Sequence, residues 1–167
     1  MDEYGSTALH HACRKGHLNV TQYLISELQC DPSPVDNDGW TPLHLACEDG
    51  HLNIIQYLIS KLQCDPSTVN KFGSTPLHLA CLNGHLNIIQ YLISELQCDP
   101  STVNVFGDTP LHCACIGGHA HIVQYLLSTG KVDPLAENNI GNTPVDYTTL
   151  SENSYDLLKL FHPFEQC

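Results

Sequence analysis

The sequence predicts an all-α solenoid of stacked helix-turn-helix units, and three observations carry this prediction. Glycines recur every 34 residues, at Gly5, Gly39, Gly73, Gly107 and Gly141. Each precedes a version of Thr-Pro-Leu-His: TALH at Thr7, TPLH at Thr41, Thr75 and Thr109, and TPVD at Thr143. A second block, GHLN, begins at Gly16, Gly50 and Gly84, with GHAH at Gly118. A fixed period of this size is typical of stacked supersecondary units.

The first helix of each unit is predicted from the Thr-Pro-Leu-His block. In the second unit, Thr41 suits a helix N-cap, because its hydroxyl can accept from an early backbone N–H. Pro42 follows at the first helical position, where its missing donor costs nothing. His44 stands at the third position, from which a capping-box partner reaches back to the cap residue. The helix should end near Asp49, because Gly50 can adopt the left-handed conformation of a helix stop.

A second helix is predicted from about Leu52 to Leu62. Its apolar positions lie on one broad face at helical spacing: Leu52, Ile54, Ile55, Leu58, Ile59 and Leu62. The segment QCDPSTVNKFG that follows is rich in turn-forming residues and predicts an extended loop.

The TPLHLAC and GH blocks with this period resemble the ankyrin repeat, over essentially the whole chain. The resemblance implies units of about 1–38, 39–72, 73–106, 107–140 and 141–167, joined by β-hairpin-like finger loops. The first and last units are expected to act as caps, and no finger is expected before the first helix. The family's usual period is 33 residues. The extra residue falls in SKLQCDP, so the second helix is expected to be extended or to end in an unusual turn.

Composition restricts the classes of partner. The 18 acidic and 6 basic residues give a formal charge of −12, which disfavours nucleic acid and anionic lipid and favours neutral or basic partners. No apolar run is long enough for a membrane span, and the N-terminus lacks the pattern of a signal peptide. We therefore expect a cytoplasmic protein, monomeric by default for a short capped array.

The nine cysteines and eleven histidines raise the question of a metal site. Zinc needs four ligands around one point, whereas equivalent residues of stacked helices stand about 8–10 Å apart. The same spacing disfavours a disulfide ladder. We expect reduced thiols that are mostly buried, with Cys30, Cys64 and Cys98 the more exposed ones. No metal and no cofactor is expected.

The histidines of the TPLH blocks could be proposed as acid–base groups, but a structural role is favoured. Four equivalent imidazoles, His10, His44, His78 and His112, would join capping turns to adjacent loops, which is also their role in the family. The histidines after glycine, such as His51, are expected to form turns. No nucleophile elbow, phosphate-binding loop or dinucleotide motif is present, so we expect no enzymatic activity.

The second and third units differ at five of 34 positions. The pairs are Trp40/Ser74, Glu48/Leu82, Asp49/Asn83, Lys61/Glu95 and Lys71/Val105. Four of the five pairs fall on finger tips or on the end of the first helix. The resemblance assigns those positions to the concave surface that binds partners. Free drift of exposed residues is the alternative, although the exposed sites Asn53 and Gln56 did not change in the copy.

The same surface is expected to carry an apolar strip with an acidic rim, as protein-recognition surfaces do. The predicted binding residues are Asp38, Trp40, Glu48, Asp49, Lys71, Phe72, Ser74, Leu82, Asn83, Val105, Phe106, Asp108 and Ile116. Trp40 is the strongest candidate for an energetic hot spot. Phe72 and Phe106 could instead pack between adjacent fingers.

Two hypotheses about function follow. The first is a non-enzymatic module that binds another protein, neutral or basic and with apolar anchors, on the concave face of the array. The second is a structural scaffold or elastic spacer, part of a longer array, with no dedicated partner at these repeats.

Overall fold

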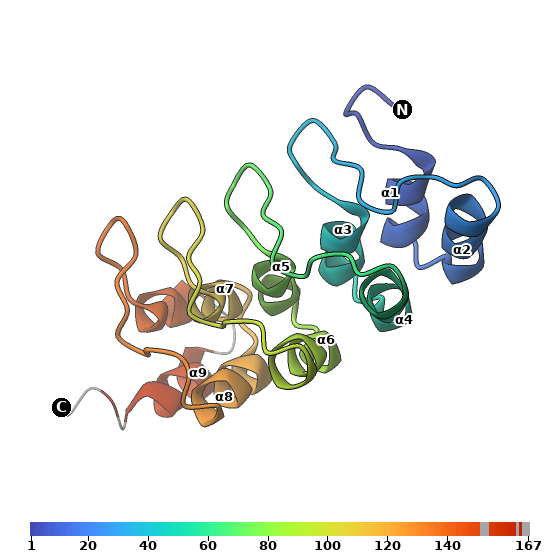
Figure 1. The fold of residues 1–167 in the computed structure, drawn as a ribbon. Coiled ribbons are helices and arrows are strands. Elements are labelled where there is room, and N and C mark those ends of the chain that lie inside the picture. Colours follow the sequence, from blue (N-terminus) through green and yellow to red (C-terminus); the bar gives the residue numbers. More distant parts are fainter. Residues whose placement is uncertain (151–153, 163, 165–167) are drawn as a thin grey trace. The chain divides into compact units, whose positions relative to one another are not determined.

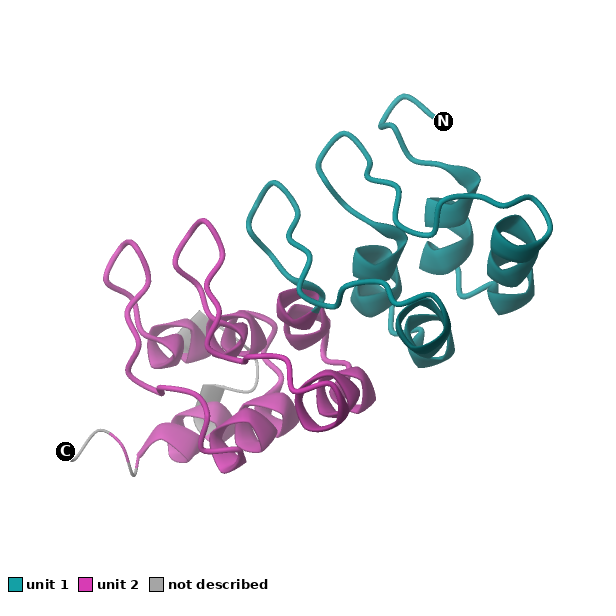
Figure 2. Cartoon of the chain, in the orientation of Figure 1, with its two compact units in different colours: residues 1–76 teal, residues 77–167 magenta. Residues whose placement is uncertain are grey.

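The structure, a computed structural model, describes residues 1–150, 154–162 and 164. The C-terminal part of the predicted last cap therefore lies partly outside the described residues. The chain divides into two compact units, Met1–Pro76 (unit 1) and Leu77–Cys167 (unit 2), which Figure 2 distinguishes by colour. The described part of the chain contains helices and loops and no strand. The all-α prediction is confirmed.

Unit 1 consists of helix pairs followed by long loops (Figure 1). Its elements are α1 (Ala8–Arg14), α2 (Leu18–Ser26), α3 (Pro42–Glu48), α4 (Leu52–Gln56) and the π-helical turn η1 (Tyr57–Lys61). Helix α1 packs against both α2 and α3, so that consecutive pairs stack side by side. The first helices are short, as predicted, and α3 ends one residue before Asp49.

Unit 2 repeats the pattern. Its elements are α5 (Pro76–Asn83, whose first residue belongs to unit 1), α6 (Leu86–Gln90), the π-helical turn η2 (Tyr91–Glu95), α7 (Pro110–Ile116), α8 (Ala120–Ser128), the 3₁₀ helix η3 (Pro144–Leu150) and α9 (Ser154–Phe161). Helix α7 packs on η3 and α8 packs on α9, so the last pair completes the stack of this unit. Leu157 and Phe161 of α9 are buried.

The predicted capping box is present at the starts of the first helices. At α3, the His44 backbone N–H donates to Thr41 Oγ1 at 3.3 Å, and the Thr41 backbone N–H donates to His44 Nδ1 at 3.2 Å. The same reciprocal pair opens α1 and α7. In the last unit Asp146 replaces the histidine, and its carboxylate accepts from both the backbone and the hydroxyl of Thr143. The bond from the cap backbone to the third side chain, one half of the capping box, therefore persists where the sequence departs from the repeat.

The other ring nitrogen of each TPLH histidine connects successive repeats. Nε2 of His10, His44, His78 and His112 lies 2.9–3.2 Å from a backbone carbonyl 30 residues ahead, at Trp40, Ser74, Asp108 and Asn142. The predicted structural role of these four residues is confirmed by this geometry.

Two of the histidines after glycine also connect repeats, a contact that the sequence did not predict. His51 Nε2 donates to the Arg14 carbonyl at 3.0 Å, and His119 Nε2 donates to the Leu82 carbonyl at 3.0 Å. Each imidazole satisfies a carbonyl at the end of the preceding first helix, where helical carbonyls lack partners. Gly16 leaves room for this bond, since a Cβ there would lie 2.6 Å from the His51 ring.

The core is the repeated apolar ladder that the sequence predicts. Leu43, Ala46, Cys47, Ile54, Ile55 and Leu58 are all buried. Leu52 and Leu62, at the ends of the predicted second helix, stay partly exposed. Among the described residues, Cys13, Cys47, Cys81 and Cys115 occupy one buried slot per repeat, and none of them is in a disulfide.

The extra residue of the 34-residue period is accommodated at the end of the second helix, as expected. In η1 and η2 the α-helix widens into π geometry, and the Leu96 N–H bonds to the Tyr91 carbonyl five residues back. Gln63 and Gln97 then adopt a left-handed conformation with φ of 57°. In the fourth repeat α8 stays regular, and Gly130 supplies the positive φ.

Finger loops follow the second helices, and their tips share one turn. Asp36 Oδ1 accepts from the backbone N–H groups of Asp38 and Trp40, both at 2.9 Å. Asn70, Asn104 and Asn138 make the same pair of bonds at the later tips. Asp2 makes them too, to Tyr4 and Ser6, so the expectation that no finger precedes the first helix is wrong.

Candidate functional site

A groove of about 510 Å³ in unit 1 is lined by residues of its three finger tips and of the first helices. Its lining residues are Asp2, Tyr4, Ser6, His11, Arg14, Asp36, Asp38, Trp40, Leu45 and Phe72. Three of them, Asp38, Trp40 and Phe72, are predicted binding residues. Three of the others, Asp2, Tyr4 and Ser6, come from the first finger, whose presence the sequence interpretation missed.

The finger tips of the groove are held rigidly by backbone hydrogen bonds. The Lys71 N–H donates to the Asp38 carbonyl at 2.9 Å, and the Asn37 N–H donates to the Tyr4 carbonyl at 2.9 Å. Adjacent tips are thus joined in a row, and the side chains of Lys71 and Phe72 project from the last tip of unit 1 into solvent. A surface held in this way loses little conformational entropy when a partner binds.

Trp40 is less exposed than the sequence suggests. Its side chain is half-buried, and its indole contacts the His44 ring edge-on, with ring centroids 6.1 Å apart. Its carbonyl accepts the His10 bond described above. Ser74 is likewise half-buried, and its carbonyl accepts from His44. The groove side of the indole remains available, since Trp40 lines the groove.

Part of the negative charge on the acidic rim of unit 1 is neutralised by Arg14 of the same unit. Arg14 donates to Glu48 at 3.0 Å and lies 3.7 Å from Asp49. These pairs are solvent-exposed and contribute little to stability, but they reduce the negative charge at the end of α3. Asp36 and Asp38, which also line the groove, have no ion-pair partner among the described residues.

In unit 2, large apolar side chains are exposed at the predicted positions. Leu82 and Ile116, near the ends of α5 and α7, are 36% and 44% exposed. Val105 and Phe106, on the finger tip between these helices, are exposed by more than half. Phe106 therefore does not pack between adjacent fingers, and Phe72 in unit 1 is also exposed. Asn83 is exposed beside Leu82, with its amide bonded to the Leu79 carbonyl.

Asp108 differs from its predicted place on an exposed rim. It is only 8% exposed, and its Oδ1 accepts from Asn138 Nδ2 at 2.7 Å. Asp108 follows Gly107, where the finger descends toward α7, so its side chain turns inward beneath the tip. The prediction of a solvated acidic rim residue at this position is wrong.

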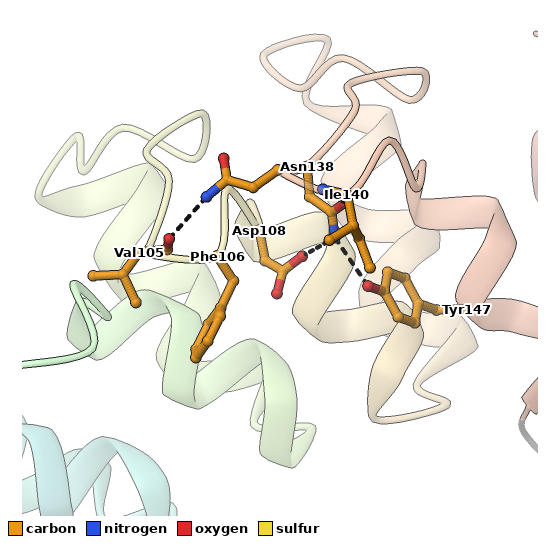
Figure 3. A pocket seen from close by; sticks show the side chains of 7 residues that line it. Val105, Phe106, Asp108, Asn138, Ile140 and Tyr147 are labelled. Atoms are coloured by element: carbon orange, nitrogen blue, oxygen red, sulfur yellow. Dashed lines mark hydrogen bonds between the residues drawn. The ribbon is translucent and has the colours of Figure 1, made fainter.

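Asp108 lies in a second pocket, of about 240 Å³, that Figure 3 shows in detail. Its lining residues are Val105, Phe106, Asp108, Asn138, Asn139, Ile140 and Tyr147. The last four escaped the sequence interpretation, which compared only the second and third units. The 34-residue spacing of Asp2, Asp36, Asn70, Asn104 and Asn138 is the signal that could have identified them.

The buried thiols and imidazoles of both units belong to the core. Burial raises the pKa of the Cys13, Cys113 and Cys115 thiols to about 12. Burial lowers the pKa of His44 and His78. No group of three or more potential metal ligands occurs within residues 1–150, 154–162 and 164. None of the described helices is long and apolar enough to cross a membrane.

Comparison with known proteins bears on this arrangement. The family described as ankyrin repeats (3 copies) matches residues 1–68, 27–104, 61–138 and 94–163, and these overlapping matches cover nearly the whole chain. A search of curated proteins gave no match.

Proposed function

This chain belongs to the ankyrin repeat family, and on that premise we propose that it binds another protein through the groove of unit 1 and the exposed apolar side chains of unit 2. Ankyrin repeats are generally protein–protein interaction modules and are typically non-enzymatic. To this general role our proposal adds the location of the binding surface, which is formed by the finger tips and the ends of the first helices.

The exposure of Phe72 and Phe106 carries the proposal. These aromatic residues occupy equivalent finger positions, and they are 45% and 57% exposed. Exposed apolar groups on a surface fixed by backbone hydrogen bonds are costly in water and favour a partner that covers them. Rigid aromatic side chains are also common hot spots of interfaces.

Charge suggests the kind of partner. Unit 1 contains nine acidic and four basic residues, and unit 2 contains nine acidic and two basic residues. In the groove of unit 1, Asp36 and Asp38 lie beside the aromatic residues Trp40 and Phe72. We expect a neutral or basic protein partner that presents apolar anchors, with Trp40 contributing the groove side of its indole.

Capture of proteins from a lysate of the source cells tests the proposal. Immobilised wild-type protein is compared with Trp40→Ala and Phe72→Ala in unit 1 and with Phe106→Ala in unit 2. The matched controls are Tyr23→Ala and Leu135→Ala, which remove large side chains exposed elsewhere in the same units.

The proposal expects proteins that the wild type and both controls retain and that at least one surface variant loses. Circular dichroism and melting temperature confirm that each variant is folded. If all variants retain the same proteins, the surface plays no part in binding, and the scaffold or spacer hypothesis is favoured instead.

A further inference from the structure

We propose that the pocket of unit 2 binds the cationic end of an arginine or lysine side chain presented by a partner protein. The inference rests on the proposed protein-binding function and adds to it a specific subsite and its chemistry. It is carried by Asp108, a buried carboxylate at the base of the pocket, and by the aromatic and apolar side chains around it.

Asp108 is held firmly but is only partly satisfied. Its backbone N–H donates to Asn104 Oδ1 at 3.0 Å, and its carbonyl accepts from His78 Nε2 at 3.1 Å. Its Oδ1 accepts from Asn138. Its Oδ2 has no hydrogen-bond or ion-pair partner among the residues that the structure describes. One anionic oxygen of a residue more than nine-tenths buried is therefore left to the pocket.

The neighbouring amide cannot supply the missing bond. Asn138 Nδ2 has two hydrogens. One is donated to Asp108, and the other to the Tyr147 hydroxyl at 2.9 Å. Asn138 Oδ1 accepts from the backbone of Ile140 and Asn142. The polar atoms of Asn138 are thus fully used, and they fix the carboxylate in place without neutralising it.

Among the described residues of unit 2, no lysine or arginine pairs with the Asp108 carboxylate. The unit contains two lysines and no arginine. Lys131 donates to Gln97, and neither lysine pairs with Asp108. Burying a carboxylate without a counter-charge is unfavourable. A cationic side chain of a partner protein would therefore pair with a carboxylate that is already desolvated.

The walls of the pocket suit a cation on an apolar stem. Figure 3 shows Asp108 between the rings of Phe106 and Tyr147, with Ile140 above it and Val105 at the left of the view. Aromatic faces attract cations, and a planar guanidinium also stacks on them. Val105, Phe106 and Ile140 are exposed enough to contact the stem and the apolar neighbours of such a residue. Arginine is therefore the favoured occupant.

The test uses the full chain, labelled with ¹⁵N, and a capped peptide Ala-Leu-Arg-Leu-Ala. We expect the peptide to shift the backbone amide signals of Phe106, Asp108 and Ile140. Replacement of the arginine by citrulline keeps the shape and removes the charge, and should weaken binding about tenfold or more. The lysine peptide should bind with intermediate affinity.

Asp108→Asn keeps an oxygen that accepts from Asn138 and removes the negative charge. We expect this variant to lose most of the affinity for the arginine peptide and to bind the citrulline peptide as the wild type does. The matched control is Glu137→Gln, which removes one charge from an exposed residue beside Asn138, on the next finger. Its affinity for the arginine peptide should change less than twofold.

Three results would overturn the inference. The first is equal binding of the arginine and citrulline peptides, and the second is an unchanged affinity of Asp108→Asn for the arginine peptide. The third is an equal loss of affinity in Asp108→Asn and Glu137→Gln, which would indicate attraction to the acidic surface as a whole. Each leaves the proposed function intact, since lysate capture that depends on Phe72 or Phe106 tests that function separately.

Discussion

His44 Nε2 lies 3.2 Å from the carbonyl oxygen of Ser74, while Nδ1 of the same ring accepts the backbone N–H of Thr41. A carbonyl can only accept and a backbone N–H can only donate, so the imidazole is neutral, with its proton on Nε2. Protonation of Nδ1 would break the bond that closes the helix cap. A neutral histidine is thus part of the connection between repeats.

Stability should therefore fall as the pH is lowered from 7.5 to 5.5. Burial lowers the pKa of His44 and His78 below the value of about 6.5 in an unfolded chain. The unfolded state then binds more protons than the folded state in this range. The stabilising contribution is complete above pH 6.5 and is lost toward the folded-state pKa. Urea unfolding at several pH values measures the slope.

A His44→Gln variant should show a smaller slope than the wild type over the same range. His17→Gln, which changes an exposed histidine, serves as the control and should alter the slope less than His44→Gln does. A pH dependence as steep in His44→Gln as in the wild type would contradict the assignment of the effect to His44.

Gln63→Gly should stabilise the protein by up to about 1 kcal/mol. Gln63 has φ of 57°, which is unfavourable for a residue with a Cβ and free for glycine. The matched control is Gln56→Gly, at φ of −60° in α4, which should destabilise by about 0.5–1 kcal/mol. Chemical denaturation of the two variants should therefore give changes of opposite sign. A loss of stability in both would show that the turn gains nothing from glycine.

Leu77→Ala should lower the free energy of unfolding by about 2–5 kcal/mol, because Leu77 is 2% exposed and the truncation leaves a cavity. Leu82→Ala on the same helix is the matched control, with a side chain that is 36% exposed. It should cost much less. Comparable losses in the two variants, measured by urea unfolding, would contradict the assigned burial.

Native thiol labelling should single out Cys30. In a Cys167→Ser background at pH 8, Cys30 is exposed and should react rapidly with a chromogenic disulfide, and Cys30→Ser should abolish that phase. Cys13, Cys113 and Cys115 are buried with a pKa of about 12, so about one thiolate in ten thousand is present at this pH. Cys64, expected from the sequence to be exposed, is buried and should react slowly. Labelling of Cys113 as fast as that of Cys30 would refute the assignment.

The repeated local chemistry made most of the fold predictable. Thr41, Pro42, His44 and Gly50 specify a helix start and stop through short-range bonds that follow from residue type alone. The extra residue predicted an unusual end of the second helix. It did not predict the π geometry found there, because several kinds of turn can accommodate one additional residue. The long-range bond of His51 to Arg14 also escaped prediction, because it depends on how two repeats pack.

The candidate site was predictable only in part. Finger-tip positions such as Phe72 and Phe106 follow from the register of the repeat, and both are exposed. The inward turn of Asp108 depends on Asn138, a residue of the next finger, which no local pattern connects to it. The lining of the first groove depends on Asp2, whose turn lies ahead of the first recognisable helix motif.

The bonds from each TPLH histidine to a carbonyl 30 residues ahead have an evolutionary consequence. Because donor and acceptor belong to consecutive copies, a 34-residue block can be duplicated or deleted in frame and both new junctions recreate the same bond. A block whose length is not a multiple of 34 residues would leave an imidazole facing the wrong backbone atom. Arrays of this type can lengthen or shorten by recombination in whole copies, while the few exposed finger positions diversify afterwards.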